Sequence, residues 1–373
     1  MKILISGDFC DRYRVSEHIA TYRFGELFEN ARPLIEDADF SVVNFEFPIV
    51  TKDENPIPKC GPNLKGQKAS IDAIKYAGFN VCTLANNHIL DQGEKCCVET
   101  KELLESAGIK TVGAGKDLAD ASKILYLQKG TERLAIINCC EHEFTIATDK
   151  SAGANPLNPV QQFYKIQEAK KNADYVLVIV HGGHEQFQLP SPRMKETYRF
   201  FIDAGADAVV NHHQHCYSGF EEYKSKPIFY GLGNLLFDDP NARNSTWNEG
   251  YMVRLNFTIN SIAFDIIPYQ QCNENVGVQI LEDRHDFDLN LTRLNAIIAD
   301  DSSLQKEVAD YYESCAKYQL SILEPYKNRV FSKLFRIGLL PKVIKGKKKF
   351  AVLNHIHCES HIDKLIYALK NNQ

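Results

Sequence analysis

The chain has 373 residues, of which 44% are hydrophobic and 24% are charged. This composition is typical of a globular protein with a sizeable core, and it excludes disordered and fibrous chains. A formal net charge of −5 argues against a nucleic-acid-binding protein, and no run approaches the roughly 18 apolar residues that a membrane-spanning helix needs.

The cysteines and the N-terminal residues favour a cytoplasmic protein. The 11 cysteines include two adjacent pairs, 96–97 and 139–140, but no CxxC pair. This spacing indicates neither a zinc ribbon nor a disulfide framework, so reduced thiols in a cytosol are the simplest account. The apolar stretch 1–8 is too short for a secretion signal, and we expect it to form the first core strand.

Strand-like and helix-like segments alternate through the first two thirds of the chain, as in an α/β protein. In chain order the predicted strands are residues 3–6, 40–44, 81–84, 123–128, 134–138, 175–180, 208–210, 227–230, 251–257 and 262–267. The predicted helices are residues 24–30, 67–76, 94–106, 159–171 and 192–204. Gly130 and Thr131 should join strands 123–128 and 134–138 as an antiparallel pair, so we expect mixed sheets.

From about residue 271 onward, helical periodicity and charge replace the strand pattern. We therefore predict one domain of residues 1–270 and a helical C-terminal extension of residues 271–373. Within the extension, residues 329–349 mix apolar and basic side chains. This mixture is typical of membrane-surface segments and also of a solvated basic face on a packed helix. Of the two interpretations, we favour the packed helix.

A polar turn follows the predicted strand 81–84 and carries Asn86, Asn87, His88 and Asp91. The carboxyl ends of strands in open α/β sheets form ligand crevices, and an amide, an imidazole and a carboxylate are well placed there. The alternative is an Asn-Asn turn with Asp91 as a helix cap. This motif alone leaves both interpretations open.

Further strand ends repeat this pattern near the N-terminus. Asp8 follows the first strand after Gly7, which allows close backbone approach. Asn44 and Glu46 lie on the same side of an extended chain. A turn, a helix cap or the ordinary end of a strand would explain each motif alone. Because the motifs recur at several strand ends, they favour a shared site.

The strands 175–180 and 208–210 also end in polar groups. His181 is followed by two glycines, which leave room for a ligand, and then by His184 and Glu185. After the next strand come His212, His213 and His215, of which the last two can face the same way as a chelating pair. Imidazoles combined with carboxylates suit Zn, Mn or Fe better than Ca or Mg.

The last motif of this kind is the glycine-rich turn 230–238, which contains Asn234. We expect this turn to line the site, although a tight connection between closing strands explains it equally well. The loops 56–65, 141–156 and 239–249 should provide substrate specificity.

Together these motifs resemble the CapA family, which is named for bacterial poly-γ-glutamate capsule synthesis and belongs to the calcineurin-like metallophosphoesterase superfamily. The resemblance covers roughly residues 1–270. It rests on Gly7-Asp8, Asn44-x-Glu46-x-Pro48, Ala85-Asn86-Asn87-His88-x-x-Asp91-x-Gly93, His181-Gly182-Gly183-x-Glu185, His212-His213-x-His215 and Tyr230-x-Leu232-Gly233-Asn234-x-x-Phe237-Asp238. It implies an α/β fold, the calcineurin-like metallophosphoesterase sandwich of two mixed β-sheets flanked by helices, with a helical C-terminal extension here.

The resemblance also implies roles for individual residues around two divalent metal ions, Mn, Fe or Zn. Asp8 would bind one ion, and Glu46 would bridge the two. Asn87 and His181 would bind the second ion, and His213 and His215 would be divided between them. His88 would stabilise or protonate the leaving oxygen as the catalytic residue. The remaining candidates, as ligands or as residues that support the ligands, are Cys10, Asn44, Asp91, His184, Glu185, His212 and Asn234.

Four residues depart from the superfamily pattern, of which Asn211 and Gln214 replace the glycine and proline more usual around the histidine pair. Cys10 stands where a histidine is usual, so one metal would be weakly held or Cys10 would serve as a softer thiolate ligand. Glu46 is longer than the usual bridging aspartate, which would alter the metal separation.

The leading functional hypothesis is a metal-dependent phosphoesterase in capsule, surface-polysaccharide or poly-γ-glutamate synthesis, acting on an anionic small-molecule or polymer substrate. One alternative is hydrolysis or transfer at a γ-glutamyl amide, which the family name suggests. The other is a non-catalytic assembly factor of a capsule-synthesis complex. Cys10 favours the assembly factor, whereas His88 favours an enzyme. The basic and apolar C-terminal residues suit peripheral association with a membrane-bound complex, so we expect a cytoplasmic protein that reaches the inner membrane surface.

Overall fold

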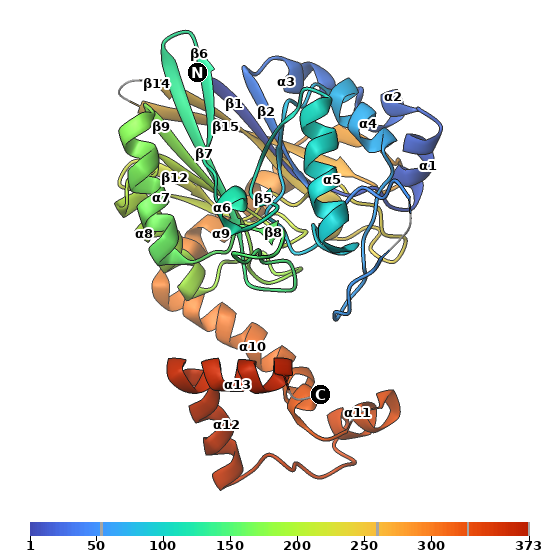
Figure 1. The fold of residues 1–373 in the computed structure, drawn as a ribbon, viewed down its shortest axis with the longest axis vertical. Helices are drawn as coiled ribbons and strands as arrows, with labels where there is room; N and C mark the ends of the chain where they lie inside the picture. Colours follow the sequence, from blue (N-terminus) through green and yellow to red (C-terminus); the bar gives the residue numbers. More distant parts are fainter. Residues whose placement is uncertain (53–54, 259–260, 327, 372–373) are drawn as a thin grey trace. The chain divides into compact units, whose positions relative to one another are not determined.

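Buried segments rich in valine and isoleucine form two mixed β-sheets, which Figure 1 shows side by side. The structure is a computed structural model that describes residues 1–52, 55–258, 261–326 and 328–371. The first sheet has the order β16-β15-β14-β1-β2-β3-β4, with β13 paired to β1. Its strands are β1 (Lys2–Phe9), β2 (Phe40–Phe45), β3 (Val81–Thr83), β4 (Lys110–Val112), β13 (Asn234–Leu236), β14 (Glu249–Thr258), β15 (Ser261–Gln271) and β16 (Val278–Ile280).

The second sheet has the order β11-β12-β10-β9-β7-β6. The predicted antiparallel pair is confirmed, because β6 and β7 run antiparallel on either side of Gly130 and Thr131. The strands are β6 (Leu125–Lys129), β7 (Glu132–Cys140), β9 (Tyr175–His181), β10 (Ala208–His212), β11 (Phe220–Tyr223) and β12 (Lys226–Phe229). The short strands β5 (Ala114–Gly115) and β8 (Gly153–Ala154) form a separate pair.

Both sheets have a parallel centre. The second sheet has antiparallel pairs at both edges, whereas the first has them on the side of β14–β16 and ends on the other side in the parallel pair β3–β4. Strand β2 runs parallel to β1 and β3, and β9 runs parallel to β7 and β10. Strand β14 is antiparallel to β1, and β11 is antiparallel to β12. Because the carboxyl ends of parallel strands meet at one edge of a sheet, the polar residues that follow these strands gather there.

Helices flank the two sheets, as Figure 1 shows. Helices α7 (Pro159–Asn172) and α8 (Pro192–Asp203) pack against the second sheet, and α5 (Gly93–Ser106) packs against β4 of the first. The side chains of Asn158 and Ser191 cap α7 and α8 and are each followed by proline, a favourable pair of start signals. The other helices of this part are α1 (Arg14–Ala20), α2 (Phe24–Phe28), α3 (Arg32–Glu36), α4 (Ala69–Ala77), α6 (Leu118–Ala121) and the 3₁₀ helix η1 (Thr246–Asn248).

Aromatic side chains join the two sheets across the core. The ring centroids of Phe229 in β12 and Phe264 in β15 are 5.2 Å apart, in an edge-on arrangement. The ring centroids of Tyr175 in β9 and Phe257 in β14 are 5.0 Å apart, with the rings tilted by 31°. Such pairs stabilise a core beyond the area that they bury, so they fix how the ends of the two sheets face each other.

The C-terminal part is helical, as predicted. Its helices are α9 (His285–Ala299), α10 (Asp301–Leu323), α11 (Arg329–Arg336), α12 (Lys347–His357) and α13 (Glu359–Asn371). The predicted fold class, an α/β sandwich of two mixed sheets flanked by helices with a helical extension, is confirmed. Among the residues described, no helix combines the length and the apolar composition that crossing a bilayer requires.

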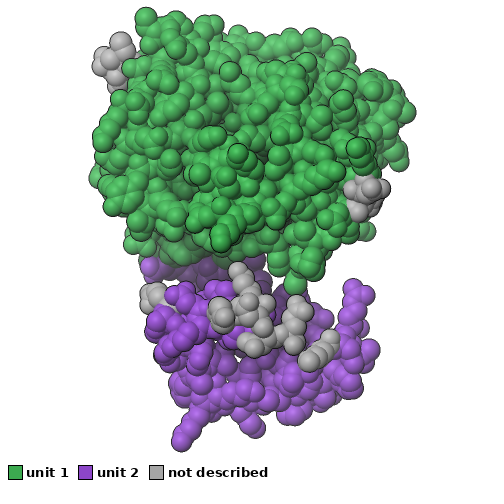
Figure 2. Space-filling view, in the orientation of Figure 1, with its two compact units in different colours: residues 1–304 green, residues 305–373 purple. Residues whose placement is uncertain are grey.

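Contacts divide the chain into two compact units, Met1–Leu304 and Gln305–Gln373, which Figure 2 colours separately. This division differs from the boundary predicted at residue 270. The first unit continues past that residue because β16 pairs with β15 and α9 packs against β11.

Gly7 provides a test of how tightly β1 is held. A Cβ atom on Gly7 would lie 1.9 Å from the carbonyl oxygen of Gly233, and the adjacent backbone N–H of Asp8 donates to that oxygen at 3.2 Å. We predict that Gly7→Ala separates β1 from its neighbour and lowers the free energy of unfolding by about 3 kcal/mol, measured by chemical denaturation.

Gly25→Ala in α2 is the matched control. Its nearest neighbour is a flexible carboxylate oxygen of Glu29 at 3.1 Å, and its backbone is helical. We expect it to change stability by less than about 1 kcal/mol, because alanine favours a helix. Equal losses in both variants would contradict the steric explanation.

Candidate metal centre

The first sheet contributes two carboxylates that one amide holds together. Asp8 in β1 pairs in register with Asn44 in β2. The Nδ2 group of Asn44 donates to Asp8 Oδ1 at 2.7 Å and is 3.3 Å from Glu46 Oε2. All three residues are buried. Asn44 therefore orients both carboxylates towards the same region.

The second sheet contributes a histidine from the end of β9. The Nε2 atom of His181 lies 3.0 Å from Asn87 Oδ1 and 3.1 Å from Nδ1 of His213. The same Nε2 atom is 3.7 Å from Oε1 of Glu46. Four potential ligand atoms, from both sheets, thus converge on one point.

His215 lies between the two carboxylates. Its Nε2 atom is 3.6 Å from Glu46 Oε1, and its Nδ1 atom is 3.6 Å from Asp8 Oδ2. Nδ1 also forms a 2.8 Å hydrogen bond with Oδ1 of Asn234 in β13. Asn234 therefore sets the ring orientation, as hydrogen-bonding partners of ligand histidines commonly do.

The acidic and imidazole groups form two sets that share one member. In each set, the ligand atoms lie within 4.8 Å of one another, and the sets are Glu46–His181–His213 and Asp8–Glu46–His215. Glu46 is common to both. A carboxylate in this position has the geometry of a bridging ligand.

Glu46 also supplies the test of whether these residues fit a metal ion. Its Oε1 atom is buried and has no hydrogen-bond partner. Burial, followed by the negative charge of Asp8, raises the pKa of Glu46 well above its usual value. A buried carboxylate without a partner is costly, and a cation beside Oε1 would remove that cost. The residues therefore fit divalent ions, and the mixture of nitrogen and oxygen donors suits Mn, Fe or Zn.

The pKa values of three other candidate ligands are shifted towards the protonation states that metal binding requires. Burial opposes ionisation of Asp8, but a hydrogen bond to His212 and the nearby histidines bring its pKa below the usual value. Burial, followed by the charge of His213, lowers the pKa of His181 well below normal. Burial, followed by His215, lowers the pKa of His213 to about 4. Neutral imidazoles and ionised carboxylates are the ligating forms.

The histidines after β10 reach the site through an unusual backbone. Strand β10 ends at His212, and the φ angles of His213 and His215 are 94° and 55°. Non-glycine residues rarely adopt this left-handed conformation, which marks functional sites when surrounding contacts hold it. A left-handed turn, rather than an extended chain, therefore brings the two rings to the centre.

His88 lies in a hydrogen-bonded chain with an aspartate and a lysine. Its Nδ1 atom is 2.5 Å from Asp91 Oδ2, and Lys59 Nζ donates to Asp91 Oδ1 at 2.5 Å. Asp91 also accepts from the backbone N–H of Leu64 at 2.6 Å. Asp91 is not the N-cap of α5, since Gln92 occupies that position. Burial lowers the pKa of His88, whereas Asp91 opposes this shift.

The supporting candidates have different surroundings. His212 Nδ1 lies 3.3 Å from Asp8 Oδ1, so it contacts a ligand. Cys10 belongs to neither ligand set found among the described residues and lies in the apolar core beside Phe9. Burial, followed by the charge of Glu46, raises the pKa of the Cys10 thiol well above normal, which disfavours the thiolate.

His184 and Glu185 also lie outside both ligand sets found among the described residues. His184 is half-buried and Glu185 is exposed. The charge of Glu185 still raises the pKa of Glu46, after burial and Asp8, so Glu185 acts on the centre electrostatically.

Three further residues approach the centre from the predicted specificity loops. Glu143 Oε1 lies 3.7 Å from Nε2 of His213, and the ring of Trp247 lies 4.7 Å from that of His215. Lys59, whose side chain is 3% exposed, reaches the Asp91 carboxylate. Loops carry no periodic pattern, so the sequence indicated these segments but not which side chains would reach the site.

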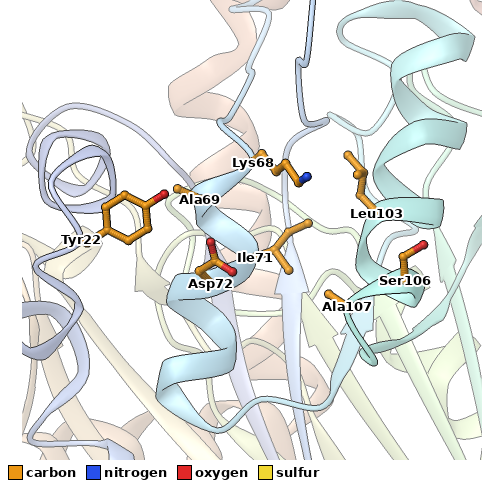
Figure 3. A pocket seen from close by; sticks show the side chains of 8 residues that line it. All are labelled: Tyr22, Lys68, Ala69, Ile71, Asp72, Leu103, Ser106 and Ala107. Atoms are coloured by element: carbon orange, nitrogen blue, oxygen red, sulfur yellow. The ribbon is translucent and has the colours of Figure 1, made fainter.

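A separate pocket of about 420 Å³ lies between α4 and α5 (Figure 3). It shares no lining residue with the ligand sets and contains one lysine and one aspartate. Its lining residues are Tyr22, Lys68, Ala69, Ile71, Asp72, Leu103, Ser106 and Ala107. It adds no ligand or acid–base group to the metal centre.

The fold and the site define an α/β protein with a buried histidine–carboxylate centre at the facing ends of two mixed sheets. The chain belongs to the bacterial capsule synthesis protein family PGA_cap, whose family model matches residues 2–239. The CapA resemblance inferred from the motifs is therefore confirmed.

Individual relatives agree with this assignment. The capsule biosynthesis protein CapA of Bacillus anthracis is 33% identical over 271 residues, which cover 70% of this chain and 65% of that protein. The PGA biosynthesis protein CapA of Bacillus subtilis (strain 168) is 32% identical over 216 residues, 57% of each chain. The chain thus spans less than two thirds of the length of either relative. A solved structure, that of a novel phosphatase from Mycoplasma pneumoniae, has a TM-score of 0.43 and 14% identity and covers 74% of this chain and 95% of that one.

The shared position of Glu46 predicts an unequal effect of ligand substitutions on metal content. Glu46→Gln should remove both ions, because the residue belongs to both sets. His181→Ala and His215→Ala should each remove about one ion per chain, because each belongs to one set. Metal content per chain, measured by mass spectrometry after reconstitution with Mn or Zn, checks this.

The control for this experiment is Glu102→Gln, which removes an exposed carboxylate of α5 outside both sets. It should retain the wild-type metal content. If Glu46→Gln bound as many metal ions per chain as the wild type, a bridging role for Glu46 would be contradicted.

Proposed function

We propose that this chain is a metal-dependent hydrolase, in the first instance a phosphoesterase, that acts in capsule or poly-γ-glutamate synthesis. The observation that carries this proposal is the buried Glu46 carboxylate shared by two ligand sets. A pair of divalent ions polarises phosphoryl oxygens and lowers the pKa of water, which is the chemistry of phosphate-ester hydrolysis.

Each of the two sets would hold one of these ions. Asp8, Glu46 and His215 would hold one ion. Glu46, His181 and His213 would hold the other, with the Asn87 oxygen beside them. The hydrogen bonds from Asn44 keep both carboxylates in place before any ion or substrate binds.

His88 would serve as the proton-transfer residue. Its Nδ1 atom is engaged by Asp91, so Nε2 is the nitrogen that can hold a proton towards a leaving oxygen. The Lys59 ammonium donates a hydrogen bond to the other carboxylate oxygen of Asp91. This chain therefore fixes the ring of His88, and a protonated Nε2 would donate to the leaving group.

The substrate would be an anionic small molecule or the polymer itself. The matched family and both Bacillus relatives are named for capsule or PGA synthesis, which supports this process. The loops that carry Glu143 and Trp247 border the ligand histidines and would shape the substrate site.

A second candidate is a non-catalytic assembly factor with a structural metal centre. The observation that favours it is the low exposure of the ligands, 0% for Asp8 and Glu46 and 5% for His213. A closed site stabilises a fold without admitting a substrate. Hydrolysis of a γ-glutamyl amide would use the same ligands and the same His88.

His88→Ala distinguishes the enzyme from the assembly factor. We expect it to lower kcat/KM for phosphate esters by about 10²- to 10⁴-fold while the metal content stays unchanged, because the residue transfers a proton and holds no ion. The measurement is a screen of phosphorylated sugars, nucleotides and γ-glutamyl amides with protein loaded with Mn, Fe or Zn.

His285→Ala, which removes an exposed histidine at the start of α9, is the control and should behave as wild type. A fully loaded wild-type protein that turns over none of these substrates would favour the assembly factor. Turnover of amides alone would favour the γ-glutamyl reaction.

A further inference from the structure

The C-terminal unit contains a stretch of strongly one-sided charge. Residues 329–349 include eight basic side chains and no acidic one, although the whole chain has a formal net charge of −5. The eight are Arg329, Lys333, Arg336, Lys342, Lys345, Lys347, Lys348 and Lys349. We refer to residues 329–350, which add Phe350, as the basic–apolar segment.

Large apolar side chains of the same segment are exposed. The exposed fraction is 66% for Val330, 62% for Ile337, 68% for Leu339 and 71% for Phe350. Single exposed apolar residues are ordinary, but several within one short segment mark an interaction surface. The favoured interpretation of this stretch as a packed helix with a solvated basic face describes it only in part, because Phe335 of α11 is buried but these apolar side chains are exposed.

The exposure belongs to a folded conformation. The Glu324 carboxylate accepts hydrogen bonds from the backbone N–H groups of Val343 at 2.9 Å and Ile344 at 3.1 Å. The Tyr326 hydroxyl donates to the Pro341 carbonyl at 2.6 Å, and its ring lies 5.5 Å from that of Phe335. Phe335 is the buried anchor of α11. These contacts attach the turn after α11 to the residues that follow α10. Ile337 and Leu339 remain exposed to solvent.

We propose that the basic–apolar segment binds the surface of an anionic lipid bilayer. The exposed apolar side chains enter the interface between headgroups and acyl chains, and the lysines and arginines lie beside the phosphates. Surface-bound helices combine these two features, and each basic residue near an anionic leaflet adds an attraction that salt weakens.

The combination of charge and exposed apolar area selects this partner over two others. A soluble polyanion would satisfy the basic groups but leave Ile337 and Leu339 in water. A second copy of the segment would bury those side chains but would bring eight positive charges against eight more. An anionic bilayer satisfies both features at once.

The test is flotation of the full chain with vesicles of phosphatidylglycerol and phosphatidylcholine in equal parts, compared with pure phosphatidylcholine. We expect at least about tenfold tighter binding to the anionic vesicles at low salt, and a loss of this preference at high salt. The double variant Ile337→Ser/Leu339→Ser and the triple variant Lys347→Gln/Lys348→Gln/Lys349→Gln should each weaken binding by about tenfold or more.

Matched variants in the first unit control for general hydrophobicity and net charge. Val160→Ser/Tyr164→Ser removes two apolar side chains of α7 that are 65% and 67% exposed. Lys95→Gln/Lys116→Gln/Lys171→Gln removes three exposed lysines. Both should bind anionic vesicles as the wild type does, and thermal unfolding should show that all four variants are folded.

The proposal is overturned if the wild-type chain fails to float, or if the control variants lose binding to the same degree. It is also overturned if poly-γ-glutamate binds the segment and Ile337→Ser/Leu339→Ser binds vesicles as the wild type does. Self-association that this double variant abolishes, without vesicle binding, would identify a second copy as the partner. None of these readouts depends on the metal centre or its activity.

Discussion

The buried carboxylate of Glu46 is the constraint on which the centre depends. It faces imidazoles on both sides, it lies close enough to Asp8 for the two negative charges to repel, and one of its oxygens has no hydrogen-bond partner. The amide of Asn44 and the ring of His215 link the two carboxylates. Such an arrangement is costly by itself, and it becomes favourable when positive charge is added between the ligands. A cation bound by these residues would therefore also stabilise the folded chain.

The surrounding fold explains how these ligands meet. Asp8 and Glu46 come from the first sheet and its following turn, whereas His181 and His213 come from the second, so the centre exists only where the two sheets face each other. Aromatic contacts such as Phe229–Phe264 hold the sheets together. The close approach of Gly7 to Gly233 brings β13 beside β1, and through Asn234 it places the ring of His215. Contacts made by residues outside the ligand sets therefore also determine where the ligand side chains lie.

Most of the central strands and the longer helices could be predicted because their signals are local. Valine- and isoleucine-rich runs predicted β9 and β10, and an Asn or Ser followed by Pro accompanied the starts of α7 and α8. Short elements such as α3 and β13 have no periodicity of their own, and β13 forms only because β1 accepts it. Repetition of polar strand ends predicted the candidate ligands. The left-handed turn at His213 and the contact between Lys59 and Asp91 could not be predicted, because both depend on residues distant in sequence.

The shared carboxylate also has a thermodynamic consequence. Two ions that use one ligand cannot bind independently, since the first changes the charge and the freedom of the group that the second must use. By linkage, an ion at either position would alter the affinity at the other by the same factor. A titration of this centre would therefore yield two macroscopic constants that belong to the pair of positions, as coupled protonation sites do, and neither constant would describe one position alone.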